Sequence, residues 1–68
     1  KTVRDLIKEL AKKYGKSLRE GIIDPRSGGV REHIVIWLNG KNVLVLEGLN
    51  TKLRHNDKVM IMPMATGG

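Results

Sequence analysis

The pair Asn39-Gly40 limits the fold of this 68-residue chain more than any other feature. It separates two runs rich in β-branched and large apolar residues in the stretch "HIVIWLNGKNVLVL", residues 33–46. Asn-Gly is the preferred pair for a two-residue type I′ turn, because both residues of that turn need a positive φ. Residues 33–46 therefore predict an antiparallel β-hairpin.

The stretch "TVRDLIKELAKKYG", residues 2–15, predicts an amphipathic helix with recognisable ends. Thr2 and Asp5 have the spacing of a capping box, and Gly15 offers a left-handed stop. Apolar residues at steps of three and four form one stripe, which we expect to face the core. The stripe consists of Val3, Leu6, Ile7, Leu10, Ala11 and Tyr14.

A single short helical turn is expected next, in the stretch "KSLREGIID". Ser17 and Glu20 repeat the capping-box spacing there. Leu18 and Ile22 would then face the core. The following residues 24–32, "DPRSGGVRE", have the composition of a turn.

The last part of the chain predicts one more strand. Residues 47–57 are expected to cross irregularly, and "KVMIMP", residues 58–63, forms a strand that Pro63 ends. The order is helix, connection, hairpin, crossing, strand. We therefore expect one α+β domain over residues 1–63 and a flexible tail over residues 64–68.

The composition argues against most enzyme classes. The chain has no cysteine, and its two histidines, His33 and His55, lie far apart without ligand spacing. We expect no metal site, no bound cofactor and no catalytic residues, with Asp57 shaping the turn into the last strand. No apolar run approaches the ~20 residues of a membrane span, and the lack of cysteine fits a cytoplasmic protein.

The charge is strongly basic, with 13 lysines and arginines against 7 acidic residues and a net charge of +6. This excess raises the alternative of a small basic module that binds RNA or an acidic protein partner without chemistry at its terminus. However, the cations are scattered, and one Trp, one Tyr and no Phe leave little for base stacking. A solvated basic surface is the simpler interpretation, and nucleic acid is not favoured as a partner.

The stretch "LNGKNVLVLEGLNTKLRHNDKVMIMPMATGG" closely resembles the C-terminal half of ubiquitin-like sulfur carriers. These include the small subunit of molybdopterin synthase and the archaeal small modifier proteins. The helix at residues 2–15 also looks like the helix of that family, and residues 16–32 match least. The motifs that carry the resemblance are Asn39-Gly40, Leu46-Glu47-Gly48-Leu49, Asp57-x-Val59-x-Ile61-x-Pro63 and Gly67-Gly68.

The resemblance implies a β-grasp fold, an antiparallel or mixed sheet packed on one helix. That fold begins with a strand hairpin before the helix, whereas the printed sequence begins in the helix cap. We therefore expect a β-grasp sheet without its first two strands. The last strand would then present an open edge.

The resemblance also implies chemistry at Gly68. An activating enzyme would adenylate this residue with ATP, and a sulfur donor would convert it to a thiocarboxylate. The sulfur would serve the synthesis of molybdopterin, with the large subunit of molybdopterin synthase as partner, or of thiolated transfer RNA; alternatively, Gly68 would be joined to target-protein lysines. The protein would then be a carrier or modifier acted on by enzymes.

The tail is suited to such an enzyme. Met64, Ala65, Thr66, Gly67 and Gly68 span roughly 16 Å when extended, at ~3.3 Å per residue. That length reaches a buried site while the folded body stays outside. Glycine is thin and conformationally permissive, because it has no Cβ. We therefore expect the residues from Met64 to Gly67 to be recognised within the activating enzyme.

The outer face of the sheet is a candidate partner patch. If Ile36 and its neighbours face the helix, then Val35, Trp37, Met60 and Met62 face the other way. Aromatic anchors and adaptable methionines are typical of protein interfaces. The equally weighted alternative is that the loops of the missing strands or a second layer cover these residues.

Overall fold

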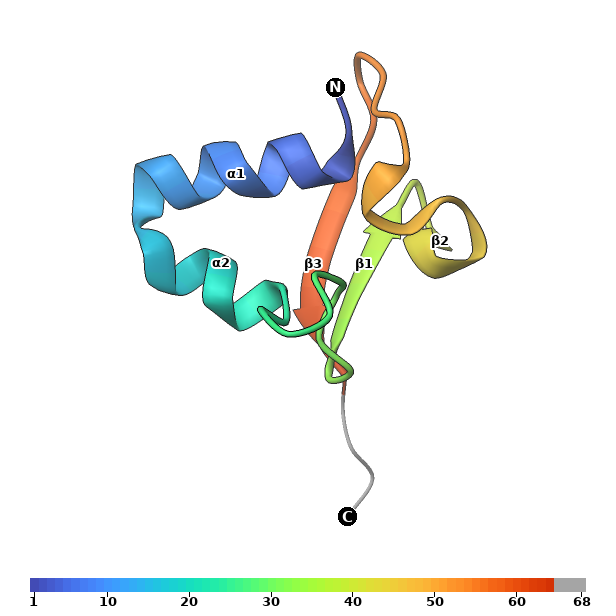
Figure 1. Ribbon diagram of the computed structural model, residues 1–68. Coiled ribbons are helices and arrows are strands. Elements are labelled where there is room, and N and C mark those ends of the chain that lie inside the picture. Colours follow the sequence, from blue (N-terminus) through green and yellow to red (C-terminus); the bar gives the residue numbers. More distant parts are fainter. Residues whose placement is uncertain (65–68) are drawn as a thin grey trace.

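Two helices cover one face of a three-stranded sheet (Figure 1). The computed structural model describes residues 1–64. Its elements are α1 (Val3–Tyr14), α2 (Lys16–Ile22), β1 (Ile34–Leu38), β2 (Lys41–Asn42), the 3₁₀ helices η1 (Val43–Val45) and η2 (Gly48–Asn50), and β3 (Val59–Pro63). The predicted order of elements and the α+β class are confirmed.

Helix α1 forms as predicted, with the capping box in place. The backbone N–H of Thr2 donates to Asp5 Oδ2 at 2.9 Å, and the N–H of Asp5 donates to Thr2 Oγ1 at 3.3 Å. Val3 and Ile7 are fully buried. Gly15 ends the helix with φ 109°, and its N–H donates to the carbonyl of Ala11 at 2.8 Å.

Helix α2 is longer than the single turn that we expected. It begins directly after Gly15, and no side chain caps it. The predicted capping box of Ser17 and Glu20 is therefore wrong, because Ser17 already lies inside the first turn. Leu18 packs against the core and Ile22 is buried, as predicted.

The hairpin turn is confirmed, but the second strand is much shorter than predicted. Asn39 and Gly40 both have positive φ, 51° and 84°. β2 ends at Asn42, whose side chain accepts from the N–H of Leu44 at 3.0 Å and so starts the 3₁₀ helix η1. Burying Val43 in the core favours this turn over continued strand pairing.

The sheet has the order β2-β1-β3, and both pairs are antiparallel. β3 pairs with β1 from Ile34 opposite Pro63 to Leu38 opposite Val59. Within residues 1–64 no strand pairs with the second edge of β3, so the last strand has an open edge, as predicted.

The core lies between the sheet, the helices and the two 3₁₀ turns. Its buried members are Val3, Ile7, Ile22, Ile23, Ile36, Leu38, Val43 and Leu49. Thr51 ties the crossing segment to α1: its carbonyl accepts from the N–H of Val3 at 3.0 Å. Val3 and Ile7 of the predicted α1 stripe are core, as expected, and Leu6, Leu10 and Ala11 are half-buried. Tyr14 was predicted wrongly to face the core: it lies in the last turn of α1 and is 65% exposed.

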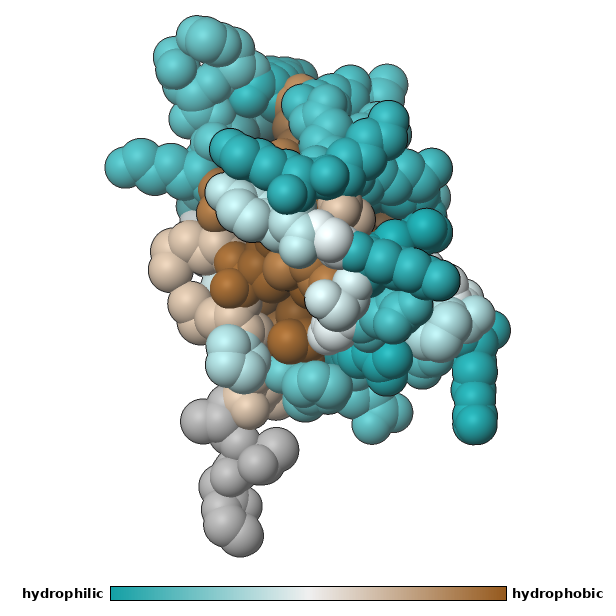
Figure 2. Space-filling model, turned by 90° about the vertical axis from the view of Figure 1, so that its left-hand side faces the viewer, coloured by the Kyte–Doolittle hydropathy of each residue, from teal (hydrophilic) through white to brown (hydrophobic). Residues whose placement is uncertain are grey.

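An apolar area remains exposed on the side of the molecule where α1 meets α2. Figure 2 shows this area at the centre of that side, surrounded mostly by polar side chains. β3 lies nearer to this side than β1 does (Figure 1), so the open edge of β3 faces the same side as the apolar area. Apolar surface and an unpaired strand edge together are usually covered in a native assembly.

Candidate functional site

The sheet register brings the four residues of the predicted partner patch together. In the pairing of β1 with β3, Val35 lies opposite Met62 and Trp37 lies opposite Met60. Residues directly opposite in an antiparallel pair point to the same side of the sheet. All four therefore share the outer face, and Ile36, opposite Ile61, points to the core.

Exposure differs sharply within this patch. Met60 is 54% exposed, Trp37 and Met62 are half-buried, and Val35 is only 8% exposed. Val35 has Met62 opposite it and Trp37 two positions along the same face, so its neighbours shield it. A partner on this face would therefore contact Met60 and Trp37 first, and the docking role of the patch remains a prediction.

The outer face adjoins the start of the predicted tail. The N–H of Met64 donates to the carbonyl of His33 at 2.6 Å, which extends the hydrogen bonding of β3 one residue past Pro63. Met64 is half exposed. The other tail positions, Ala65, Thr66, Gly67 and Gly68, lie outside the described residues. Their predicted part in recognition and activation therefore stays a prediction.

A polar cluster at the far end of the sheet fixes the register that builds this face. Asn39 Nδ2 donates to Asp57 Oδ1 at 2.9 Å, and Asn39 Oδ1 accepts from the N–H of Lys58 at 2.9 Å. Asp57 Oδ2 accepts from the N–H of Arg54 at 2.7 Å. These bonds join the hairpin turn to the turn before β3.

The same bonds stabilise the ionised carboxylate of Asp57. The Arg54 backbone N–H first, and the Asn39 side chain second, lower the pKa of Asp57 below its ordinary value of 3.8. Asp57 thus shapes the turn into the last strand, as predicted.

Three exposed apolar residues after β2 escaped the sequence interpretation. Leu44 is 67%, Val45 is 75% and Leu46 is 41% exposed. They were expected to form a strand, where alternation would bury every second side chain. The sequence signal for this exposure is the unbroken apolar run itself, because a half-buried strand buries only every second side chain.

The described residues contain no group of three metal-ligating side chains close enough to hold an ion. Within the same residues, no helix is long and apolar enough to cross a membrane.

The comparisons with known proteins agree on one kind of relative. The model of the ThiS family matches residues 1–68. The chain is 42% identical over 67 residues to the "Putative sulfur carrier protein" of Archaeoglobus fulgidus, covering 98% of this chain and 74% of that protein. It is 33% identical over 67 residues to "Small archaeal modifier protein 3" of Haloferax volcanii, covering 98% of this chain and 70% of that protein.

The fold is also that of a solved structure. A chain in the crystal structure of the Amycolatopsis orientalis BexX/CysO complex superposes with a TM-score of 0.84, at 19% identity, over 98% of this chain and 72% of that chain. At this identity the likeness speaks for the fold alone, and it confirms the predicted β-grasp class.

Proposed function

Because the chain belongs to the ThiS family of ubiquitin-like sulfur carriers, we propose that its carboxyl group at Gly68 is the reactive group that it carries. The observation that supports this most is the position of Gly67-Gly68. The pair follows within four positions of Met64, which is hydrogen-bonded to the sheet and ends the described part of the chain. An end so short and free of bulky residues can enter an enzyme while the sheet docks outside it.

The chemistry begins with activation, because a carboxylate is a poor electrophile. A carboxylate oxygen attacks the α-phosphorus of ATP, pyrophosphate leaves, and a mixed anhydride with AMP forms at Gly68. A sulfur nucleophile then attacks the carbonyl carbon and AMP leaves. The carrier supplies the acyl group, while the activating enzyme and the sulfur donor supply the catalysis and the sulfur.

The outer face of the sheet is proposed as the docking surface for the activating enzyme. Trp37 and Met60 would provide the anchors, Met62 would support them, and Val35 would lie beneath. This face continues into Met64 and so into the tail, which would let one partner hold both. Methionine side chains adapt to different surfaces, which suits a carrier that meets more than one partner.

The fate of the activated end has two branches. The relative named a sulfur carrier favours a thiocarboxylate, whose sulfur would be used for molybdopterin, with the large subunit of molybdopterin synthase as partner, or for transfer RNA. The relative named a modifier supports attack on the adenylate by a target-protein lysine, which forms an isopeptide bond. Both branches start from the same adenylate, and both belong in the cytoplasm, where ATP is available.

ATP–pyrophosphate exchange tests the proposal. The wild-type chain and a variant without Gly67-Gly68 are each mixed with the adenylating enzyme of the host, and label exchange into ATP is measured. We expect exchange with the wild type and none with the deletion, while the urea unfolding curves coincide. Exchange that is absent with both chains, together with RNA affinity that survives the deletion, would instead favour a basic binding module.

A further inference from the structure

The groove between α1 and α2 gathers five of the thirteen lysines and arginines of the chain. Two adjoining hollows of about 300 and 330 Å³ lie along it, and both are lined by Lys16 and Arg19 of α2. Helix α1 adds cations at every fourth residue: Arg4, Lys8 and Lys12. The fold thus concentrates a charge that looks scattered in the sequence.

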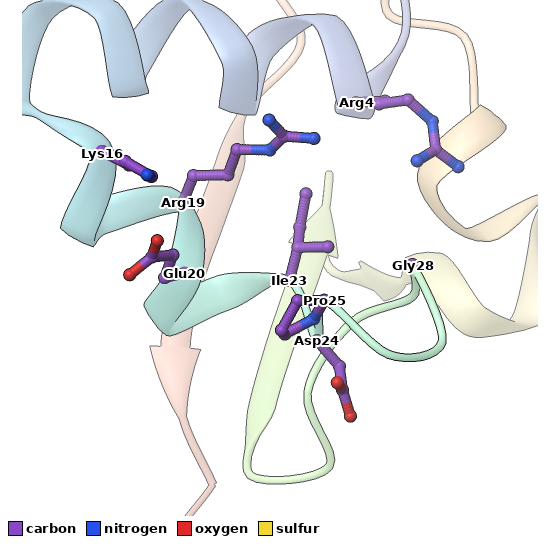
Figure 3. Close-up of a pocket in the computed structure, with 8 residues that line it drawn as sticks. All are labelled: Arg4, Lys16, Arg19, Glu20, Ile23, Asp24, Pro25 and Gly28. Carbon is purple, nitrogen blue, oxygen red and sulfur yellow. The ribbon is translucent and has the colours of Figure 1, made fainter.

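Arg19 points into the groove, and the nearby acids point away from it. Figure 3 shows Arg19 reaching from α2 toward the space above Ile23 and Arg4 extending from α1 on the side of Gly28, while the carboxylates of Glu20 and Asp24 are directed away from Ile23. Asp24 is engaged in its own turn, where Oδ1 accepts from the N–H of Arg26 at 2.8 Å. The two acids therefore leave the positive charge inside the groove in place.

No carboxylate within residues 1–64 forms an ion pair with the five groove cations at 4.0 Å or less. The ion pair of this part of the chain joins Lys1 to Glu9, outside the groove lining. Like charges four residues apart on a helix repel each other, so this arrangement lowers the stability of α1. A groove lined by one sign of charge raises the local concentration of ligands of the opposite charge.

The dimensions and the floor of the groove identify the kind of ligand. Arg4 and Lys12 are eight residues apart on α1, roughly 12 Å at ~1.5 Å per residue, which exceeds the reach of one phosphate or carboxylate. The floor offers only a small apolar surface, because Ile23 is 6% exposed and Ala11 is half-buried. A ligand that fits needs several negative charges along its length and a small apolar group toward Ala11.

We propose that this groove binds an acidic amphipathic segment of a partner protein. Carboxylates at four-residue spacing on such a segment would pair with the cations, and its apolar residues would cover Ala11. RNA fits less well, because no aromatic side chain lines either hollow and a phosphate backbone leaves the apolar floor unused. The surface goes beyond the proposed terminal chemistry and does not depend on it.

The groove and the outer sheet face can be occupied together. The helices cover the face of the sheet that carries Ile36, and Trp37 and Met60 lie on the opposite face (Figure 1). A partner bound between α1 and α2 would therefore leave the outer face accessible. The chain could hold an acidic partner while its end is activated or delivers its group.

The test uses a synthetic amphipathic helical peptide with Glu at four-residue spacing and Leu on its other face, and a matched peptide with every Glu replaced by Gln. Each is titrated into the ¹⁵N-labelled chain and followed by amide chemical shifts. We expect the Glu peptide to shift residues of α1 and α2, and to bind more weakly as salt rises. The double variant Arg4→Gln/Arg19→Gln should weaken its binding about tenfold, as the loss of two charge-assisted contacts predicts.

The control variant Lys41→Gln/Lys58→Gln removes the same charge from the hairpin and the start of β3, and it should bind the Glu peptide as the wild type does. Equal weakening by both double variants, equal binding of the Gln peptide, or no binding of the Glu peptide would overturn the proposal. Tighter binding of a single-stranded RNA of matched charge at the same groove residues would also overturn it, in favour of nucleic acid. The folded state of each variant is checked from its amide spectrum.

Discussion

Replacing Asn39 by alanine should strongly destabilise the chain, because this residue holds the hairpin in register. Alanine removes the hydrogen bonds to Asp57 and from Lys58, both at 2.9 Å, and it must still adopt a φ of 51°. Two exposed hydrogen bonds contribute about 0.5–1 kcal/mol each. The left-handed backbone costs a residue with a Cβ about 1–2 kcal/mol.

The sum is a loss of about 2–4 kcal/mol, a large part of the roughly 3–5 kcal/mol expected for so small a domain. The matched variant Asn39→Gly loses the same bonds but accepts the positive φ freely. Glycine also gives the unfolded chain more conformational freedom, which offsets part of this advantage. Asn39→Gly should therefore cost about 1 kcal/mol less than Asn39→Ala. The N–H of residue 39, which donates to the carbonyl of Lys58 at 2.9 Å, is kept in both variants.

Urea unfolding followed by the fluorescence of Trp37, the one tryptophan of the chain, measures both variants. We expect the free energy of unfolding to fall in the order wild type, glycine variant, alanine variant. Equal stability of the alanine and glycine variants would refute the role of the positive φ. A glycine variant as stable as the wild type would refute the role of the side-chain bonds.

Three further predictions concern other parts of the structure. Because the pKa of Asp57 is lowered in the folded chain, the contribution of Asp57 to stability is present above the ordinary pKa of 3.8 and is lost as the pH falls through the folded value. Asp57→Asn should therefore flatten the acid side of the plot of unfolding free energy against pH. An unchanged plot would contradict this. Thr2→Ala should cost about 1 kcal/mol in urea unfolding through loss of the helix cap, whereas Thr2→Ser should cost little; equal costs would argue against the cap. Met60→Glu should change the free energy of unfolding by less than about 0.5 kcal/mol, since Met60 is 54% exposed. The same variant should weaken the proposed docking to the activating enzyme, measured as a raised KM in ATP–pyrophosphate exchange. An unchanged KM would remove the outer face from the proposal.

Local signals in the sequence predicted the parts of the fold that local interactions decide. The capping box of Thr2 and Asp5 lies within one helical turn, and the Asn39-Gly40 turn depends on two φ angles. Both could therefore be predicted without knowledge of the tertiary structure. The capping box at Ser17 failed because its position depends on where α1 ends, and Gly15 places α2 directly after it.

The end of β2 could not be predicted, because it is decided by packing at a distance. The run after Asn42 has strong strand propensity, yet burial of Val43 against the core outweighs that preference and leaves Leu44 and Val45 exposed. Strand propensity reflects how well a residue fits a half-buried, pleated surface in general. This segment follows β2, which lies at the edge of the sheet, so within the described residues no strand lies beyond it.

The candidate sites also divide into features that local sequence predicts and features that depend on tertiary packing. Alternation along β1 and β3 predicted correctly which residues share the outer face, but the burial of Val35 depends on the cross-strand register with Met62. The cations of the helical groove were overlooked because they seemed scattered. The four-residue spacing of Arg4, Lys8 and Lys12 could have indicated a single helical face.

The most direct test of the account is the intact mass of the protein purified from its host without reducing or alkylating agents. We expect a species in which one oxygen of the Gly68 carboxyl is replaced by sulfur, or lysine-linked conjugates through the same carbonyl, and neither when Gly67-Gly68 is deleted. A population that carries only the unmodified carboxyl, even after incubation with the activating enzyme, ATP and a sulfur donor, would contradict it.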